Sequence, residues 1–241
     1  MTVQPTIDKE GEKTFTCTVC GRKKTETVKK LPSAGETGKE DVANNSVKLD
    51  SGISLKWKGK AIALKWAKVA GAEGYDVFAA QSGKKLNQKS PVKTVKNGKT
   101  SVSLTKIAGK KIAGKKVYSV KIKAWKYADG KKIYIGSSRT YHIAGKENRK
   151  YTNAKKLKPA KKKYVLKKGR SFRIKVTIIR QSKKKKLPPK SYGPALQYLS
   201  DNEKIATVTQ GGKVKAKKKG ICYIYVTALN GVRTKIKITV K

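Results

Sequence analysis

Residues 117–124 read Val-Tyr-Ser-Val-Lys-Ile-Lys-Ala, and this stretch decides the fold class. Its apolar side chains fall on every second position: Tyr118, Val120, Ile122 and Ala124. A period of two is typical of a β-strand with one face in a core and the other in water. The pattern returns at 62–66, 172–178 and 236–240, and turn pairs such as Asn97-Gly98 separate the strands. We therefore predict an all-β protein of two tandem antiparallel sandwiches, with a short hairpin before them.

The charge is large and unevenly placed. The 241 residues include 61 Lys+Arg and 14 Asp+Glu, which gives a formal net charge of +47. Residues 1–50 are nearly neutral, so almost all of this charge lies in 51–241. Most of the cations are lysines, which act as hydrated point charges, whereas arginine forks read bases and phosphates bidentately. The composition favours diffuse attraction to polyanions over base-specific recognition.

The sequence contains few side chains that could act in acid–base or nucleophilic catalysis. His142 is the sole histidine of the sequence, and few carboxylates follow residue 50. Asp201 and Glu203 lie in Ser-Asp-Asn-Glu-Lys, which is typical of a turn between strands, and His142 fits a strand better than a ligand position. We therefore predict no enzyme, no catalytic or metal-binding residues and no cofactor.

The N-terminal segment carries a Cys-x-x-Cys pair. Alternating Thr, Phe and Val on either side of Cys20-Gly21 predict two short strands in a hairpin over residues 1–31. A second Cys-x-x-Cys, which a four-ligand zinc site needs, is absent from the sequence. We favour a disulfide between Cys17 and Cys20, or an idle reduced pair, over a metal or redox site. Residues 32–46 are polar and contain glycine, which predicts a linker.

The first basic body, 47–145, resembles a fibronectin type III domain over 51–145. The resemblance rests on Ala-Leu-Lys-Trp at 63–66, on the run Val69 to Val77, and on 116–124. It implies that Trp66 and Tyr75 fill the core and that Tyr118 makes the corner that pins its strand. No Arg-Gly-Asp tripeptide is present, so integrin binding is not implied.

Residues 157–241 resemble a group 2 bacterial immunoglobulin-like domain, after a predicted basic linker at 146–156. The resemblance rests on 166–172, on Tyr-Leu-Ser-Asp-Asn-Glu-Lys-Ile-Ala-Thr-Val at 198–208, and on 212–226. Tyr198 stands where the family often has Trp, and residues 181–189 form an insert. Cys222 lies two and four residues before Ile224 and Val226, so its side chain should point to the same face of the strand. We therefore expect a buried thiol that behaves as a small hydrophobe.

The region 14–26 resembles short Cys-hairpin modules that occur beside these two domain types in large secreted or wall-associated proteins of anaerobic Gram-positive bacteria. The resemblances together imply a non-catalytic extracellular or cell-wall-associated module, a spacer or an adhesin. We expect a monomer or part of a longer surface chain. No secretory signal is visible at the start, and no apolar run reaches the roughly 20 residues that a membrane span needs.

The lysines suggest a partner, an anionic wall polymer or an acidic glycan, bound weakly through counterion release. Three groups of lysines are the candidate contacts: Lys161, Lys162 and Lys163; Lys183, Lys184, Lys185, Lys186 and Lys190; and Lys217, Lys218 and Lys219. A solvated coat that binds nothing in particular is the alternative for each. Two rivals remain for the whole chain: a basic protein that binds nucleic acid non-specifically, and an accessory module of a larger secreted enzyme.

Overall fold

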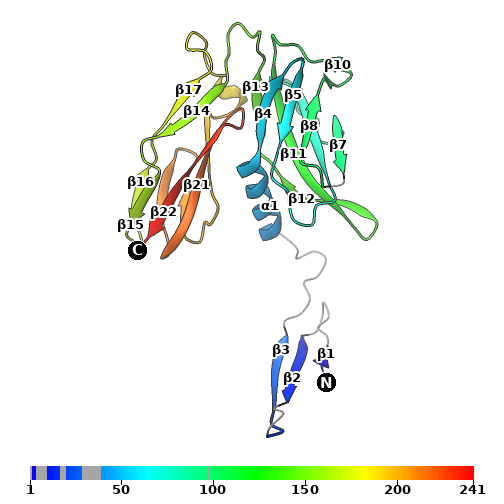
Figure 1. Ribbon diagram of the computed structural model, residues 1–241, viewed down its shortest axis with the longest axis vertical. Coiled ribbons are helices and arrows are strands. Elements are labelled where there is room, and N and C mark those ends of the chain that lie inside the picture. The colour runs from blue at the N-terminus through cyan, green and yellow to red at the C-terminus, as the bar shows by residue number, and fades with distance from the viewer. Residues whose placement is uncertain (1, 4–9, 17–19, 29–38, 97) are drawn as a thin grey trace. The chain divides into compact units, whose positions relative to one another are not determined.

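The computed structural model describes residues 2–3, 10–16, 20–28, 39–96 and 98–241, which fall into two compact units, Met1–Val42 and Ala43–Lys241. The first unit contains an antiparallel sheet of β1 (Thr2–Val3), β2 (Gly11–Thr16) and β3 (Lys23–Val28). The two strands expected on either side of Cys20-Gly21 are β2 and β3 (Figure 1). Gly21 has a φ of +68°, a conformation that glycine adopts in turns without steric cost.

A helix, α1 (Lys39–Gly52), replaces part of the linker that the sequence predicts at 32–46. Its C-terminal half packs on the first sandwich, where Leu49 is fully buried in the core. The Asn45 side chain donates a hydrogen bond to the carbonyl of Ile135 (2.9 Å), and the backbone N–H of Ser137 donates to Ser46 Oγ (2.9 Å). These contacts hold the helix at Asn45 and Ser46 against strands that are distant in the sequence, so the local sequence pattern does not reveal them.

The first sandwich consists of two antiparallel sheets (Figure 1). One sheet has the order β4 (Ser54–Lys58), β5 (Ala61–Lys65), β8 (Ser101–Leu104). The other has the order β12 (Lys131–Ser137), β11 (Val117–Ala128), β6 (Gly74–Gln81), β7 (Lys93–Lys96), and β13 (Tyr141–Ala144) also pairs with β11. A small hairpin of β9 (Lys106–Ile107) and β10 (Lys110–Lys111) separates β8 from β11 in the sequence.

Four aromatic side chains, Trp66, Tyr75, Tyr118 and Tyr141, are buried in the otherwise aliphatic core of this sandwich. Trp66 and Tyr75 are buried with their rings edge to face at a centroid distance of 5.3 Å, a favourable geometry for aromatic pairs. The hydroxyl of Tyr75 accepts a hydrogen bond from the backbone of Val69 (2.9 Å). The buried Tyr118 accepts one from the backbone of Ala113 (2.7 Å), which fixes the turn before β11.

The second sandwich has three sheets. The largest has the order β15 (Lys163–Leu166), β22 (Arg233–Val240), β21 (Gly220–Ala228), β18 (Leu196–Ser200). The others are β16 (Ser171–Arg173), β20 (Lys213–Ala216), β19 (Ala206–Val208), and the pair β14 (Ala154–Pro159) with β17 (Val176–Arg180). The predicted all-β class is confirmed, although the strands β15 and β22 of this sandwich run parallel to each other.

Aliphatic residues dominate the second core. Ile224, Val226, Ile236 and Ile238 are fully buried, and Cys222 lies among them with 2% of its surface exposed. Burial raises the pKa of the Cys222 thiol, so the thiol stays neutral. Tyr198 is the buried aromatic residue of this core.

Candidate functional site

The structure separates the three predicted lysine groups. Lys161 and Lys162 lie just before β15 and Lys163 is its first residue; the carbonyl of Lys162 accepts a hydrogen bond from the N–H of Lys237. Residues 183–186 and Lys190 lie in the insert between β17 and β18, and residues 217–219 form the turn between β20 and β21. Because separate parts of the sandwich present them, these lysines form no single site.

Backbone hydrogen bonds gather further lysines around residues 217–219. The N–H groups of Lys217 and Lys218 donate to the carbonyl of Ile205, and that of Lys168 donates to the carbonyl of Lys241. Since Gly169 bonds to Ala216, the chain beside Lys168 reaches the base of the same turn. Strand pairing thus brings together lysines that are far apart in the sequence.

The insert does more than enlarge a loop. Thr152 donates a backbone hydrogen bond to the carbonyl of Lys186 (2.8 Å), and Lys186 donates to Lys150 (3.1 Å). The 3-10 helix η1 (Lys190–Tyr192) then places the Tyr192 ring on His142, with ring centroids 5.6 Å apart and planes inclined by 13°. The insert therefore connects the second sandwich to β13 of the first.

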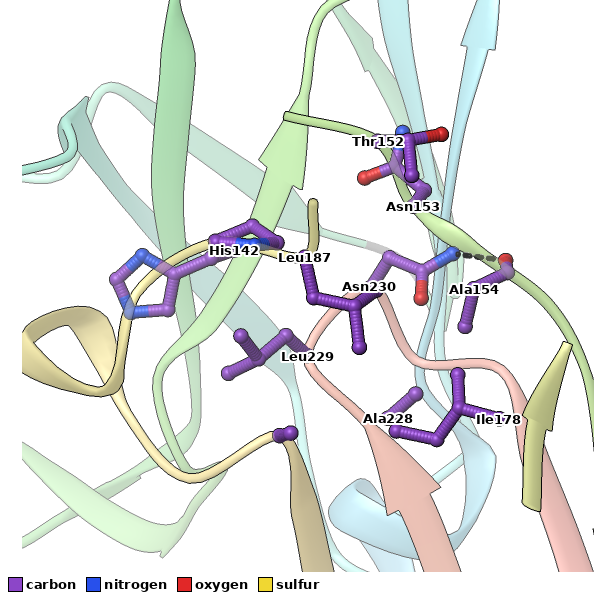
Figure 2. Close-up of a pocket in the computed structure, with 11 residues that line it drawn as sticks. His142, Thr152, Asn153, Ala154, Ile178, Leu187, Ala228, Leu229 and Asn230 are labelled. Carbon is purple, nitrogen blue, oxygen red and sulfur yellow. Dashed lines mark hydrogen bonds between the residues drawn. The ribbon is translucent and has the colours of Figure 1, made fainter. Parts of the chain in front are cut away.

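Direct hydrogen bonds join the two sandwiches as well. The N–H of His142 donates to the carbonyl of Leu229 (2.7 Å), and that of Leu55 donates to Asn230 (3.3 Å). The Asn230 side chain donates to the carbonyl of Ala154 (3.0 Å), as Figure 2 shows. We call this set of contacts, with the insert, the junction.

The segment between the sandwiches is ordered by its own asparagines. Asn153 makes two hydrogen bonds of 2.8 Å with the backbone of Ala144, one as donor and one as acceptor. Asn148 donates to the carbonyl of Lys115 (2.7 Å) and accepts from two following N–H groups. The linker predicted at 146–156 is therefore fixed against the first sandwich, and β14 already begins at Ala154.

His142 lies in β13, as its sequence context suggests, and contacts Ser82. Its Nδ1 is 2.9 Å from Ser82 Oγ, and both side chains are 6% exposed. Burial lowers the pKa of His142 to about 4, although a backbone contact with Tyr192 acts in the opposite direction. The cavity beside it, between Leu187 and Leu229 (Figure 2), has a volume of only ≈ 10 Å³. That is about the space of one water molecule, so a substrate cannot enter, and the pair belongs to the packing of the junction.

Asp50 connects α1 to both sandwiches. Its Oδ1 accepts hydrogen bonds from the N–H of Arg139 (2.8 Å) and the hydroxyl of Tyr141 (3.0 Å). The Arg139 guanidinium, whose Nε is 3.5 Å from Asp50, also donates to the carbonyl of Tyr198 in the second sandwich (3.1 Å). Burial raises the pKa of Asp50, and these partners only partly offset that effect.

A second buried carboxylate lies on the outer face of the first sandwich. Asp76 is 1% exposed and accepts hydrogen bonds from Lys132 (2.6 Å), Tyr134 (2.8 Å) and Thr94 (2.8 Å). Burial raises its pKa, but the three hydrogen bonds outweigh burial, so the pKa is lowered overall. Lys132 also lies 4.4 Å from the centre of the Trp125 ring. Sequence analysis missed this cluster, because residues 76, 94 and 132 are far apart in the chain.

The remaining candidates do not converge. Asp201 accepts a hydrogen bond from the backbone of Tyr223 (2.8 Å) and Glu203 is exposed, as expected for a turn. Cys20 is exposed, whereas Cys17 lies outside the described residues, so their disulfide stays a prediction. Among the residues that the structure describes, no group of three or more His, Cys, Asp or Glu side chains could hold a metal ion.

A groove opens where the sandwiches meet, with a volume of ≈ 530 Å³. Its walls are the last turn of α1 (Ser51 and Gly52), Ala67, and four residues of β21 and β22: Tyr225, Arg233, Thr234 and Lys235. Arg233 and Lys235 are its charged lining residues. The groove therefore combines cations with an aromatic ring.

A protein-family model matches the second sandwich. Residues 153–240 match the model of the bacterial Ig-like domain (group 2), in agreement with the resemblance seen in the sequence. A search of curated proteins gives no match.

Several solved structures are similar to this chain. The S-layer protein rSbsC is 17% identical over 75% of this chain and 22% of its own length, with a TM-score of 0.30. The FN1–FN3 domains of chicken CNTN1 are 14% identical over 78% and 65% (TM-score 0.28). Cadherin domains 1–4 of protocadherin gamma B7 are 8% identical over 96% and 57% (TM-score 0.29). This chain spans less than two thirds of each of them.

Within the described ranges, none of the helices combines the length and the apolar character needed to cross a bilayer.

Proposed function

We propose that this chain is a non-catalytic extracellular or cell-surface module that holds two sandwiches in a fixed arrangement and presents a cationic exterior to anionic polymers. The junction is the observation that carries the spacer role. It combines backbone hydrogen bonds between the sandwiches, a bonded connecting segment and an insert that stacks on His142. A flexible tether makes few such contacts, because chains rich in small polar residues stay mobile.

A distance measurement tests the spacer role. Spin labels at exposed Lys60 and Lys218, each changed to cysteine in a chain without its native cysteines, report the separation of the sandwiches by pulsed electron resonance. We expect a narrow distance distribution, and a broader one for Asn153→Ala, which loses both hydrogen bonds to Ala144. Asn87→Ala is the matched control, since Asn87 caps backbone N–H groups in an exposed loop. A broad distribution in the unchanged chain would refute the spacer role.

Charge supports the polymer contact. With 61 basic against 14 acidic side chains, basic groups outnumber acidic groups by more than four to one. On the strands they alternate with buried residues, as in β22, so their ammonium groups stay in water while the stems cover apolar surface. A polyanion would relieve the repulsion between adjacent lysines and release its own counterions.

Retention on matrices tests this second role. We expect binding to an anionic matrix at low salt that is lost as the salt concentration rises. The reason is that the screening length falls to about 8 Å at physiological ionic strength and becomes shorter above it. Equal retention on anionic and neutral matrices at low salt would refute it. Retention on nucleic acid alone would favour the rival, a nucleic-acid-binding protein.

A further inference from the structure

The outer face of the sheet formed by β15, β22 and β21 carries tyrosines beside lysines. Tyr223 and Tyr225 are two residues apart on β21, so both side chains leave the same face. Their cross-strand partners on β22 are Lys237 and Lys235. Lys163 of β15 lies next to Lys237 in the adjacent pairing. Cations and rings thus form neighbouring rows on one surface.

The rings hold at least one cation in position. The Lys235 ammonium lies 5.0 Å from the centre of the Tyr223 ring, within the range of a cation–π interaction. Lys235 and Tyr225 both line the groove described above, and Arg233 stands beside them with one guanidinium nitrogen 3.4 Å from the carbonyl of Ile53. Tyr223 therefore orients a charge at the mouth of a groove whose wall contains a second tyrosine.

The charge balance of this face is positive. Lys163, Arg233, Lys235 and Lys237 contribute four positive charges, and the nearby carboxylate is Asp201, which acts on the pKa of Tyr225. Asp201 already accepts a hydrogen bond from the backbone of Tyr223. Among the described residues that line the groove, none has a carboxylate side chain, so an anionic group entering the groove meets the cations of Arg233 and Lys235.

We propose that this groove and face bind a chain of an acidic polysaccharide, with Tyr225 stacking on a sugar ring and Lys235, supported by Arg233, pairing with a sugar carboxylate. The proposal rests on the proposed polyanion contact and names its partner class. A carboxylated sugar chain presents apolar ring faces and charges in alternation, which matches a tyrosine beside a lysine. A polyphosphate offers charge without a ring face, and a neutral glucan offers ring faces without charge.

The test compares two double variants that remove equal charge. Lys235→Gln with Lys237→Gln alters the proposed face, and Lys213→Gln with Lys215→Gln alters exposed lysines on β20 in another sheet. The probes are polygalacturonate, polyphosphate and neutral dextran, with affinities measured by biolayer interferometry at low and physiological salt. Because charge-assisted contacts are short-ranged and each 1.4 kcal/mol is tenfold, we expect the first pair to weaken polygalacturonate binding about tenfold and the second pair about twofold.

A single variant tests the ring. Tyr225→Leu keeps an apolar side chain in the groove but removes the aromatic face. We expect it to weaken polygalacturonate binding roughly fivefold, the size of a lost stacking contact, and to leave polyphosphate binding unchanged. Circular dichroism and thermal unfolding identify any variant that fails to fold, and Tyr225→Phe, which keeps the ring, then serves as the folded comparison and should bind like the unchanged chain.

The outcomes separate the two proposals. If no polyanion binds in a salt-dependent way, the proposed polyanion contact fails and this inference fails with it. If polyanions bind but both lysine pairs lower the affinity equally, the general contact stands and the specific face is refuted. Equal loss of polyphosphate and polygalacturonate binding in Tyr225→Leu would refute the stacking role.

Discussion

The two sandwiches share an architecture but are stabilised differently. The first buries Trp66, Tyr75, Tyr118 and Tyr141 and satisfies the tyrosine hydroxyls with backbone or carboxylate partners. The core of the second contains one buried aromatic side chain, Tyr198, and is otherwise aliphatic apart from the neutral thiol of Cys222. A buried polar network costs free energy when a partner is lost, whereas an aliphatic core responds to lost volume. The first sandwich should therefore be sensitive to the loss of single polar atoms and the second to the loss of methyl groups.

The largest test of this contrast removes the carboxylate of Asp76. Asp76→Ala leaves Lys132, Tyr134 and Thr94 without their common acceptor. We expect a loss of about 3 kcal/mol in the free energy of unfolding, near the low end for a broken buried pair because Lys132 is partly exposed. All three tryptophans, Trp57, Trp66 and Trp125, lie in the first sandwich, so fluorescence during urea unfolding reports on it.

Asp201→Ala removes an exposed carboxylate of the second sandwich for comparison. Asp201 is exposed and accepts one backbone hydrogen bond, so we expect a loss of at most about 1 kcal/mol. Equal losses for Asp76→Ala and Asp201→Ala would mean that the buried hydrogen-bond cluster of Asp76 adds no stability beyond that of an exposed carboxylate.

The next test uses pH and the junction. The pKa of His142 is lowered from 6.5 to about 4 in the folded chain, so between these values the unfolded chain binds the proton and the folded chain does not. Stability is complete above pH 6.5 and falls as the pH drops towards 4, by at most about 3 kcal/mol. The measurement is chemical unfolding at pH 7, 5.5 and 4.5.

A variant isolates the histidine in that pH series. Acidic groups also titrate below pH 5, so the signal is the difference between the unchanged chain and His142→Gln, which does not titrate. We expect the two curves to converge as the pH falls. Parallel curves from pH 7 to 4.5 would mean that His142 carries no part of the acid sensitivity.

A smaller loss of stability is expected when the turn before β11 is weakened. Tyr118→Phe removes only the hydroxyl that accepts the N–H of Ala113, and we expect a loss of about 1–1.5 kcal/mol. In the second sandwich, Ile236→Val removes one buried methylene group and should cost about 1 kcal/mol. If Tyr118→Phe has no effect on urea unfolding, the hydroxyl does not pin the strand.

The smallest effect concerns a thiol. Cys222 is buried and its pKa is raised by burial, so its thiolate is scarce. In a Cys17→Ser, Cys20→Ser chain, we expect Ellman's reagent to modify Cys222 only on unfolding, with little change in stability. Rapid modification of the folded chain would show that the second core admits reagent and is looser than its packing implies.

Alternation in the sequence predicts most of the strands because half-buried strands force every second residue to be apolar. It also places Tyr118, Val120 and Ile122 on the core side, where they lie. The resemblances add positions such as Trp66 and Tyr75, which periodicity alone cannot rank by depth. The match at 153–240 agrees with the region that the sequence identifies.

The features that escape sequence analysis depend on contacts between distant residues. Helix α1 contains Asn44, Asn45 and Ser46, which favour caps and loops in isolation, and partners 90 or more residues away stabilise it. The junction joins Asn230 to Leu55 and Ala154. The groove is likewise lined by residues of β22 and of the end of α1, which are far apart in the sequence, so no local sequence motif predicts it.

The parallel pairing of β15 with β22 has a mechanical consequence. Residues Lys163 to Leu166 lie beside Lys237 to Val240 in the same direction. Tension applied between the junction and residue 241 pulls on the N-terminal end of β15 and on the C-terminal end of β22. The two strands are then pulled past each other along their axes. The hydrogen bonds between them then bear the load together instead of opening one at a time, and the second sandwich should resist extension as a shear-loaded element.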